Sequence, residues 1–176
     1  MKVIRIDSAA DTRPITGAIM SESSLRPDRR PLFLPDGQWV CEIRLAIHVS
    51  RLGKAISAKF APRYYTEYTV VNYMRPATGG DAITDNLMDD AIVHGAWQPL
   101  DNLPETVRID NTDVETDFCN TIVDSLIEHL SARMTFKTGD ILILPRTLFS
   151  YVPAINRTIT VEALPDLHHL LEFTIK

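Results

Sequence analysis

The sequence predicts an α+β fold in which strands outnumber helices. The chain has 176 residues, of which 45% are hydrophobic and 23% charged, values typical of one folded domain rather than a disordered chain. Short segments of alternating or continuous apolar residues recur along the chain, whereas only one long segment has helical spacing. We therefore expect one β-dominated domain over residues 1–176, with one clear amphipathic helix.

The N-terminal half contains three predicted strands and one long loop. Val3–Ile6 forms the first short strand, and the proline-rich stretch 11–35 is expected to be loop. Glu42–Val49 alternates strictly between apolar and other residues, which is typical of a half-buried strand. Tyr64–Met74 is rich in aromatic and β-branched residues and predicts the next strand.

The C-terminal half contains the predicted helix. Residues 79–112 show little pattern, whereas apolar residues recur at helical spacing over 120–134, with Thr121 and Asp124 as a candidate capping box. A turn at Lys137–Asp140 precedes a buried strand. The remaining strands are expected at 141–144, 158–161 and 170–175, the last two forming a closing hairpin.

Charge and cysteine content exclude several function classes. Eighteen basic residues against 23 acidic ones give a net charge of −5, so the chain lacks the basic surface that generic binding to nucleic acid or anionic membranes needs. No apolar run approaches the roughly 20 residues of a membrane span. Cys41 and Cys119 have no CxxC spacing and no signal peptide precedes them, so we expect buried, reduced thiols in a cytoplasmic protein.

Three blocks of sequence carry a family resemblance. The first is Arg51-Leu52-Gly53-Lys54-Ala55-Ile56 followed by Lys59-Phe60-Ala61-Pro62-Arg63-Tyr64-Tyr65. The others are residues 126–143, which include Thr138-Gly139-Asp140, and the ending Leu170–Lys176. In this order they resemble the small bacterial single-domain branch of the fumarylacetoacetate hydrolase family. The segment 31–36 also resembles the one that precedes the metal-binding strand in that branch.

The resemblance implies a mixed β-roll fold, a homodimer and a magnesium or manganese ion. It also implies cleavage, decarboxylation or isomerisation of 2-oxo and acylpyruvate-type acids. A Glu-x-Glu pair on one strand face and an Asp on a neighbouring strand would supply hard oxygen ligands for the ion. The ion would then polarise the keto oxygen of the substrate.

Residue by residue, the implied site is eroded. An alignment without gaps places the first family glutamate on Glu42, the second on Arg44 and the aspartate on Tyr73. The substrate-binding turn falls on 144–147, where its glycine is replaced by Pro145, which has no N–H. The histidine of the family's N-terminal pattern is missing from 6–13, and the family's lysine has no equivalent. Metal binding and metal cofactors are therefore expected to be lost.

Three functions are compatible with this pattern. The first is a pseudoenzyme, or a binder of a small carboxylic acid or other anion, whose remnant pocket is lined by Glu42, Arg44, Tyr73 and Arg146. The second is an active hydrolase, decarboxylase or isomerase, and the third is a structural or partner-binding dimer with a closed pocket. Arg44 either forms a salt bridge with Glu42 or grips an anion together with Arg146.

The histidines are interpreted as structural or exposed. His48 shares a strand face with Glu42 and Arg44, but a single strand histidine is usually a hydrogen-bonded structural residue. The pair at 168–169 has no third metal ligand nearby in the sequence. The chain contains no Gly-x-Ser-x-Gly elbow, P-loop or dinucleotide fingerprint.

Overall fold

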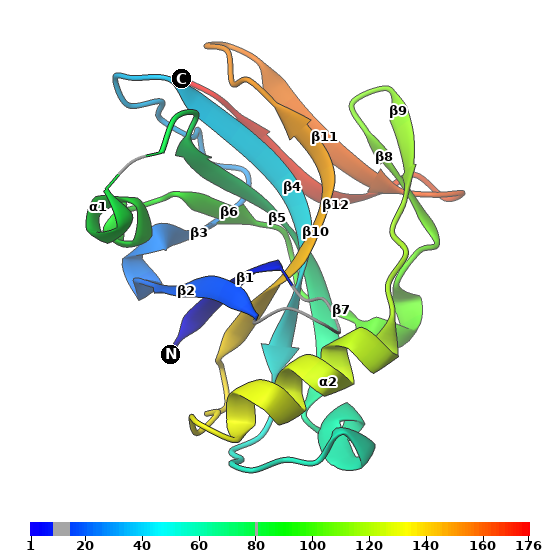
Figure 1. The fold of residues 1–176 in the computed structure, drawn as a ribbon. Helices are drawn as coiled ribbons and strands as arrows, with labels where there is room; N and C mark the ends of the chain where they lie inside the picture. The colour runs from blue at the N-terminus through cyan, green and yellow to red at the C-terminus, as the bar shows by residue number, and fades with distance from the viewer. Residues whose placement is uncertain (9–14, 80) are drawn as a thin grey trace.

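The computed structural model describes residues 1–8, 15–79 and 81–176, and two β-sheets dominate it (Figure 1). The larger, eight-stranded sheet has the order β2-β1-β10-β4-β5-β6-β3, with β7 paired to β5, and it curls into a half-barrel. The smaller sheet has the order β12-β11-β8-β9. These observations confirm the predicted β-dominated α+β class.

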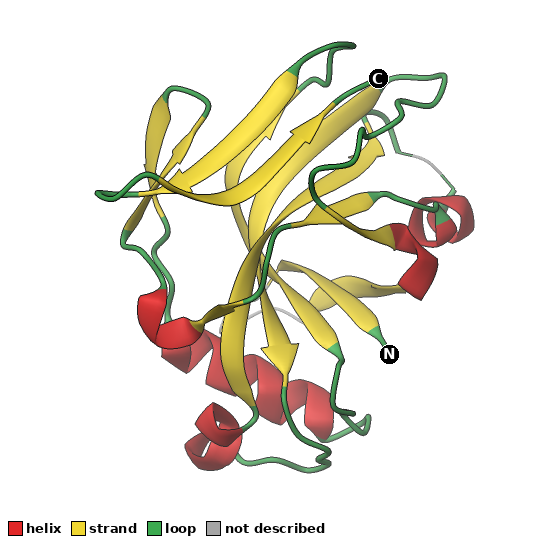
Figure 2. Cartoon of the chain, turned by 180° about the vertical axis from the view of Figure 1, so that it is seen from behind, coloured by secondary structure: helices red, strands yellow, loops and turns green. Residues whose placement is uncertain are grey.

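The strands of the larger sheet are β1 (Val3–Ser8), β2 (Thr16–Met20), β3 (Leu25–Pro27), β4 (Trp39–Val49), β5 (Tyr65–Pro76), β6 (Ile92–His94), β7 (Gln98–Pro99) and β10 (Ile141–Tyr151). Those of the smaller sheet are β8 (Thr106–Ile109), β9 (Thr112–Glu115), β11 (Thr158–Ala163) and β12 (His168–Thr174). The α-helices are α1 (Ala82–Leu87) and α2 (Asn120–Ser131), and 3-10 turns cover Glu22–Ser24, Ala58–Arg63 and Leu100–Asn102. Figure 2 shows the helices, strands and loops from the opposite side of the molecule. No helix among the described residues is long and apolar enough to cross a membrane.

The alternation of β4 divides its side chains between two layers. Ile43, Leu45 and Ile47 are buried in a core cluster shared with α2 and the smaller sheet. Ala46 belongs to a second cluster on the opposite face, and Glu42 and Arg44 share that face because side chains alternate along a strand. Antiparallel pairing of β4 with both β5 and β10 places β4 in the middle of the sheet. The predicted strand at Glu42–Val49 is therefore confirmed and is the element that positions the site, but it is buried on both faces rather than half-buried as expected, because the second face packs against the second cluster.

The helix α2 is confirmed with its predicted start at residue 120, but it ends at Ser131 rather than at residue 134, and the predicted capping box is wrong. It begins at Asn120, and its N-cap is Cys119, which makes no side-chain capping bond. Asp124 does not take part in a capping box, because its carboxylate accepts a hydrogen bond from the Tyr65 hydroxyl at 2.8 Å. Cys119 is exposed and not buried as expected, whereas Cys41 is buried.

Two segments contain more structure than their sequences indicate. The stretch 11–35 is not a continuous loop: residues 11–14 lie outside the described residues, but β2 pairs with β1 and β3 pairs with β6. Residues 79–112 contain α1, β6, β7 and β8. These strands are two to five residues long, so main-chain pairing with distant strands, rather than a local hydrophobic period, determines them.

The C-terminal hairpin is confirmed, and β10 is longer than predicted. Strand β11 pairs antiparallel with β12, as the sequence indicates. Strand β10 continues past Leu144 to Tyr151, and its register against β4 shifts between Ile143 and Thr147. Pro145 lies within this irregular part, where a missing N–H costs no regular ladder bond. The segment 144–147 is therefore strand and not the turn that the family resemblance implies.

Candidate functional site

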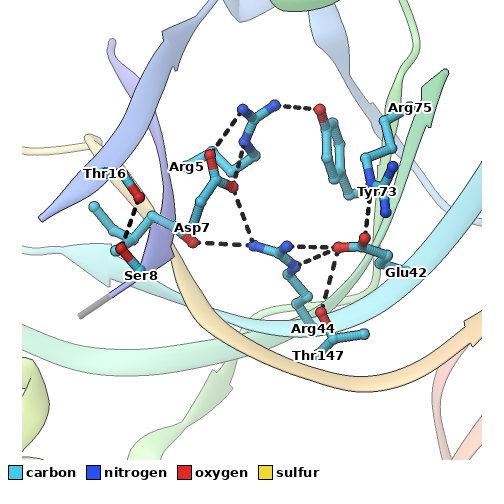
Figure 3. A network of polar contacts seen from close by, with 10 residues as sticks. Arg5, Asp7, Ser8, Thr16, Glu42, Arg44, Tyr73, Arg75 and Thr147 are labelled. Atoms are coloured by element: carbon cyan, nitrogen blue, oxygen red, sulfur yellow. Dashed lines mark hydrogen bonds and ion pairs between the residues drawn. The ribbon is translucent and has the colours of Figure 1, made fainter. Parts of the chain in front are cut away.

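Four strands of the curled sheet bring a group of polar side chains together on one face (Figure 3). Strand β4 contributes Glu42 and Arg44, and β5 contributes Tyr73, whose backbone lies directly across from Glu42. Thr147 of β10 lies across from Arg44. Three further residues that the sequence did not single out complete the group: Arg5 and Asp7 of β1 and Arg75 of β5.

The centre of the group is an ion pair between Glu42 and Arg44. One carboxylate oxygen of Glu42 accepts hydrogen bonds from Arg44 Nε at 2.9 Å and Nη2 at 2.5 Å. The other accepts from Arg75 Nε at 2.7 Å. Both members of the central pair keep only 8% of their side-chain surface exposed. Burial alone would raise the pKa of Glu42, but the hydrogen bonds and charges of Arg75 and Arg44 outweigh burial, so this pKa is lowered.

Arg44 also links β4 to β1. Its Nη1 donates to the Ile6 carbonyl at 3.0 Å and lies 3.7 Å from Asp7. Asp7 in turn accepts from Arg5 at 2.8 and 3.0 Å. These contacts use most of the donors of Arg44 within the protein. The expected salt bridge between Arg44 and Glu42 is therefore present, and the Arg44 guanidinium is not free to bind a ligand.

Tyr73 joins the polar group through contacts with Arg5. Its hydroxyl accepts a hydrogen bond from Arg5 Nη1, and the Arg5 guanidinium lies 4.9 Å from the centre of the Tyr73 ring. Burial is the main reason why the pKa of Tyr73 is raised, so the hydroxyl keeps its proton at neutral pH. Among the described residues no acceptor for that proton is found within hydrogen-bonding distance. Tyr73 is only 1% exposed, so a bound molecule could accept this proton only from the cavity that Tyr73 lines.

Tyr73 lines a cavity of about 300 Å³. Its lining combines Arg5, Tyr73 and Arg75 with Asp85 and Asn86 of α1 and the connecting residues Pro76 and Gly79. The side chain of Arg75 is 41% exposed and uses its Nε on Glu42 and its Nη1 on the Pro76 carbonyl, at 3.2 Å. The remaining donors of Arg75 and the Tyr73 hydroxyl give the cavity a hydrogen-bonding wall suited to an anionic group.

The predicted pocket residues are only partly brought together. Glu42, Arg44 and Tyr73 lie in one network, but Arg146 is elsewhere: it donates to Asp117 and to the Glu115 carbonyl at 3.2 Å. It lines a separate, mainly apolar cavity of about 150 Å³ between α2 and β10. The structure therefore does not pair Arg146 with Arg44.

Alternation along the strands could have identified the residues that the sequence analysis missed. Arg5 and Asp7 are two apart on β1, and Arg75 follows Tyr73 by two on β5, so each pair shares a strand face. What the pattern lacks is the order of the strands in the sheet, which brings β1 and β5 to one concave face. His48 lies outside the network and contacts Glu67 through Nδ1 at 3.1 Å, consistent with a structural role.

The residues present do not fit a divalent metal ion. Both oxygens of Glu42 already accept from guanidinium groups, and the positions at which the family resemblance implies further carboxylates hold Arg44 and Tyr73. Magnesium and manganese prefer several negatively charged or neutral oxygen ligands, and a guanidinium at the same place repels them. No group of three or more histidine, cysteine, aspartate or glutamate side chains in the described part of the chain could hold a metal.

Solved structures of similar fold include enzymes, whereas no family model and no curated protein matches the sequence. A 2-hydroxyhepta-2,4-diene-1,7-dioate isomerase from Mycobacterium marinum superposes with a TM-score of 0.81 and 18% identity, over 99% of this chain and 73% of that one. For a fumarylpyruvate hydrolase from Pseudomonas aeruginosa, in complex with Mn²⁺ and pyruvate, the TM-score is 0.78, the identity 15%, and the coverage 99% and 89%.

A third similar structure, from Yersinia pestis CO92, is described as a fumarylacetoacetate hydrolase family protein. It has a TM-score of 0.79 and 17% identity, over 99% of this chain and 92% of that one. Nearly the whole chain thus superposes on each of these structures, although few residues are identical. The chain has the fold of the fumarylacetoacetate hydrolase family, which confirms, at the level of fold, the resemblance seen in the sequence.

Proposed function

We propose that this protein binds a small carboxylic acid without a divalent metal ion and does not carry out metal-dependent cleavage or isomerisation. The observation that carries this proposal is the use of both Glu42 oxygens by the guanidinium groups of Arg44 and Arg75. Because Arg44 provides a positive charge inside the protein, Glu42 needs no external cation to neutralise it. The protein is then a pseudoenzyme built on an enzyme fold.

The open donors of the cavity support a carboxylate as the ligand. The Tyr73 hydroxyl and the uncommitted donors of Arg75 line the same cavity, and a carboxylate can accept from both at once. Its volume of about 300 Å³ is at the lower end of the range for small-molecule sites. The ligand is therefore small.

Thermal unfolding in the presence of ligands tests this function. A ligand present at about 100 times its Kd stabilises the native state by about 2.7 kcal/mol, which raises the Tm of a chain of this size by about 5 to 10 °C. We expect such a shift with small carboxylic acids and none with Mg²⁺ or Mn²⁺. Arg75→Gln should abolish the shift, whereas Arg51→Gln, at an exposed position outside the cavity, should leave it unchanged.

Two results would contradict the proposal in different ways. Metal-dependent turnover of an acylpyruvate or of oxaloacetate, lost in Glu42→Ala, would establish an active enzyme in which Glu42 and Arg44 have altered roles. No response to any carboxylic acid would favour a purely structural or partner-binding protein.

We propose further that the chain acts as one cytoplasmic domain that forms a homodimer and does not bind nucleic acid. A core cluster that includes residues from both sheets supports a single domain. The net charge of −5 argues against nucleic-acid binding. Exposed apolar side chains near the C-terminus support a dimer.

A further inference from the structure

The cavity beside Tyr73 has walls of opposite charge. Arg5 and Arg75 lie on the strand side, and Asp85 of α1 also lines the cavity. Asp85 forms no ion pair within 4.0 Å with any described residue, and its carboxylate has no hydrogen-bond partner there either. Tyr73 and Asp85 line the same cavity, and the negative charge of Asp85 contributes to the raised pKa of Tyr73, after the larger effects of burial and Asp7.

The charged side chains of the cavity and of the adjoining network are equal in number and opposite in sign. Arg5, Arg44 and Arg75 stand against Asp7, Glu42 and Asp85, of which Asp85 alone forms no ion pair with a described residue. A ligand with a net charge would leave one charge in this partly buried cavity without a counter-charge. Its binding would therefore cost free energy. A ligand that carries both a carboxylate and a cation avoids this cost.

The opposite charges of the two walls determine the order of groups on such a ligand. The carboxylate would accept from the Tyr73 hydroxyl and Arg75, because these donors have unused capacity. A cationic group would then face Asp85, the carboxylate that lacks a counter-charge. From this arrangement we infer that the ligand is a small zwitterionic α-amino acid, rather than a 2-oxo acid. This inference rests on the proposed carboxylate-binding function and specifies its ligand class.

Calorimetric titration with pairs of acids that differ only at the α-carbon tests the inference. The pairs are L-alanine with pyruvate, and L-glutamate with 2-oxoglutarate. In at least one pair the amino acid should bind about tenfold more tightly than its oxo analogue, the effect of one charge-assisted hydrogen bond. Asp85→Asn should remove that preference by weakening the amino acid alone, because the oxo acid makes no bond to Asp85.

Two controls make the test specific. Asp89→Asn changes an exposed acidic residue near α1 that does not line the cavity, and it should preserve the preference for the amino acid. Tyr73→Phe should weaken both members of a pair equally, because it removes the donor to the shared carboxylate. The Tm of each variant without ligand verifies that it folds.

The outcomes separate this inference from the proposed function. Oxo acids that bind as tightly as the amino acids, or an Asp85→Asn variant that weakens both equally, would overturn the amino-acid inference while the carboxylate site remained. No binding of any of the four acids would overturn the carboxylate site as well.

Discussion

At the scale of single residues, Arg44 is the most sensitive position of the polar network. In Arg44→Met the Glu42 carboxylate keeps its contacts with Arg75 and Thr147 but loses its buried counter-charge. We expect a loss of about 3 kcal/mol in the free energy of unfolding at pH 7, because a buried carboxylate is left undercompensated. Urea denaturation at pH 7 measures this loss.

The pH dependence of the same variant provides its control. The folded pKa of Glu42 is lowered, so its stabilising effect is complete above the unfolded pKa of about 4.3 and is lost as the pH falls through the folded pKa. In Arg44→Met this pKa rises, so the difference between wild type and variant should shrink on acidification. A difference that stays constant from pH 7 to pH 3 would show that Glu42 is not the group responsible. The double variant Glu42→Leu/Arg44→Met should be more stable than Arg44→Met alone.

At the scale of secondary-structure elements, α2 tests how packing and capping contribute to stability. Its inward face consists of Val123, Leu126 and Ile127, all buried. Leu126→Ala should cost about 3 kcal/mol, the usual effect of removing a buried leucine side chain from a close-packed core. Thr121→Ala should change the free energy of unfolding by less than about 0.5 kcal/mol, because Thr121 is exposed and makes no cap.

Thermal or urea unfolding of the two α2 variants distinguishes the packed helix from a capped one. A loss of more than about 1 kcal/mol in Thr121→Ala would restore the capping box as the start of the helix. The structure instead attaches this end of α2 through the bond from the Tyr65 hydroxyl to Asp124. The first turn is therefore held by tertiary contact with β5.

At the scale of the whole molecule, exposed apolar side chains lie near the C-terminus. Phe33, Val152 and Ile155 are 69%, 71% and 66% exposed. Their segments are neighbours, because the bridge between Leu32 and Ile175 and the bond from the Asn156 N–H to the Ile175 carbonyl bring both segments to Ile175, directly after β12. Exposed apolar groups of this kind are typical of contact surfaces between proteins.

We expect this surface to contact a second copy of the chain. Sedimentation equilibrium should give twice the monomer mass of 19.8 kDa, and the Tm should rise with protein concentration, because dimerisation stabilises the native state by mass action. Phe33→Ser should lower the association constant, whereas Leu52→Ser, at another exposed apolar residue outside this surface, should not. Monomeric wild type at all concentrations would contradict the homodimer.

The sequence predicted the elements whose pattern is contained within one segment. The alternation of 42–49, the helical spacing after residue 120 and the C-terminal hairpin each depend on neighbours along the chain, and each is found in the structure. The short strands β2, β3 and β6 were missed because three to five residues carry too little period to detect.

For the site, strand alternation predicts that Glu42 and Arg44 share a face, and Tyr73 offers a hydroxyl rather than a carboxylate. The folded chain adds Arg5, Asp7, Arg75 and Asp85 to these residues and leaves Arg146 apart. This division arises because side-chain direction along a strand follows from local geometry. Which strands and helices meet around one cavity follows instead from long-range pairing and sheet curvature, which no local pattern specifies.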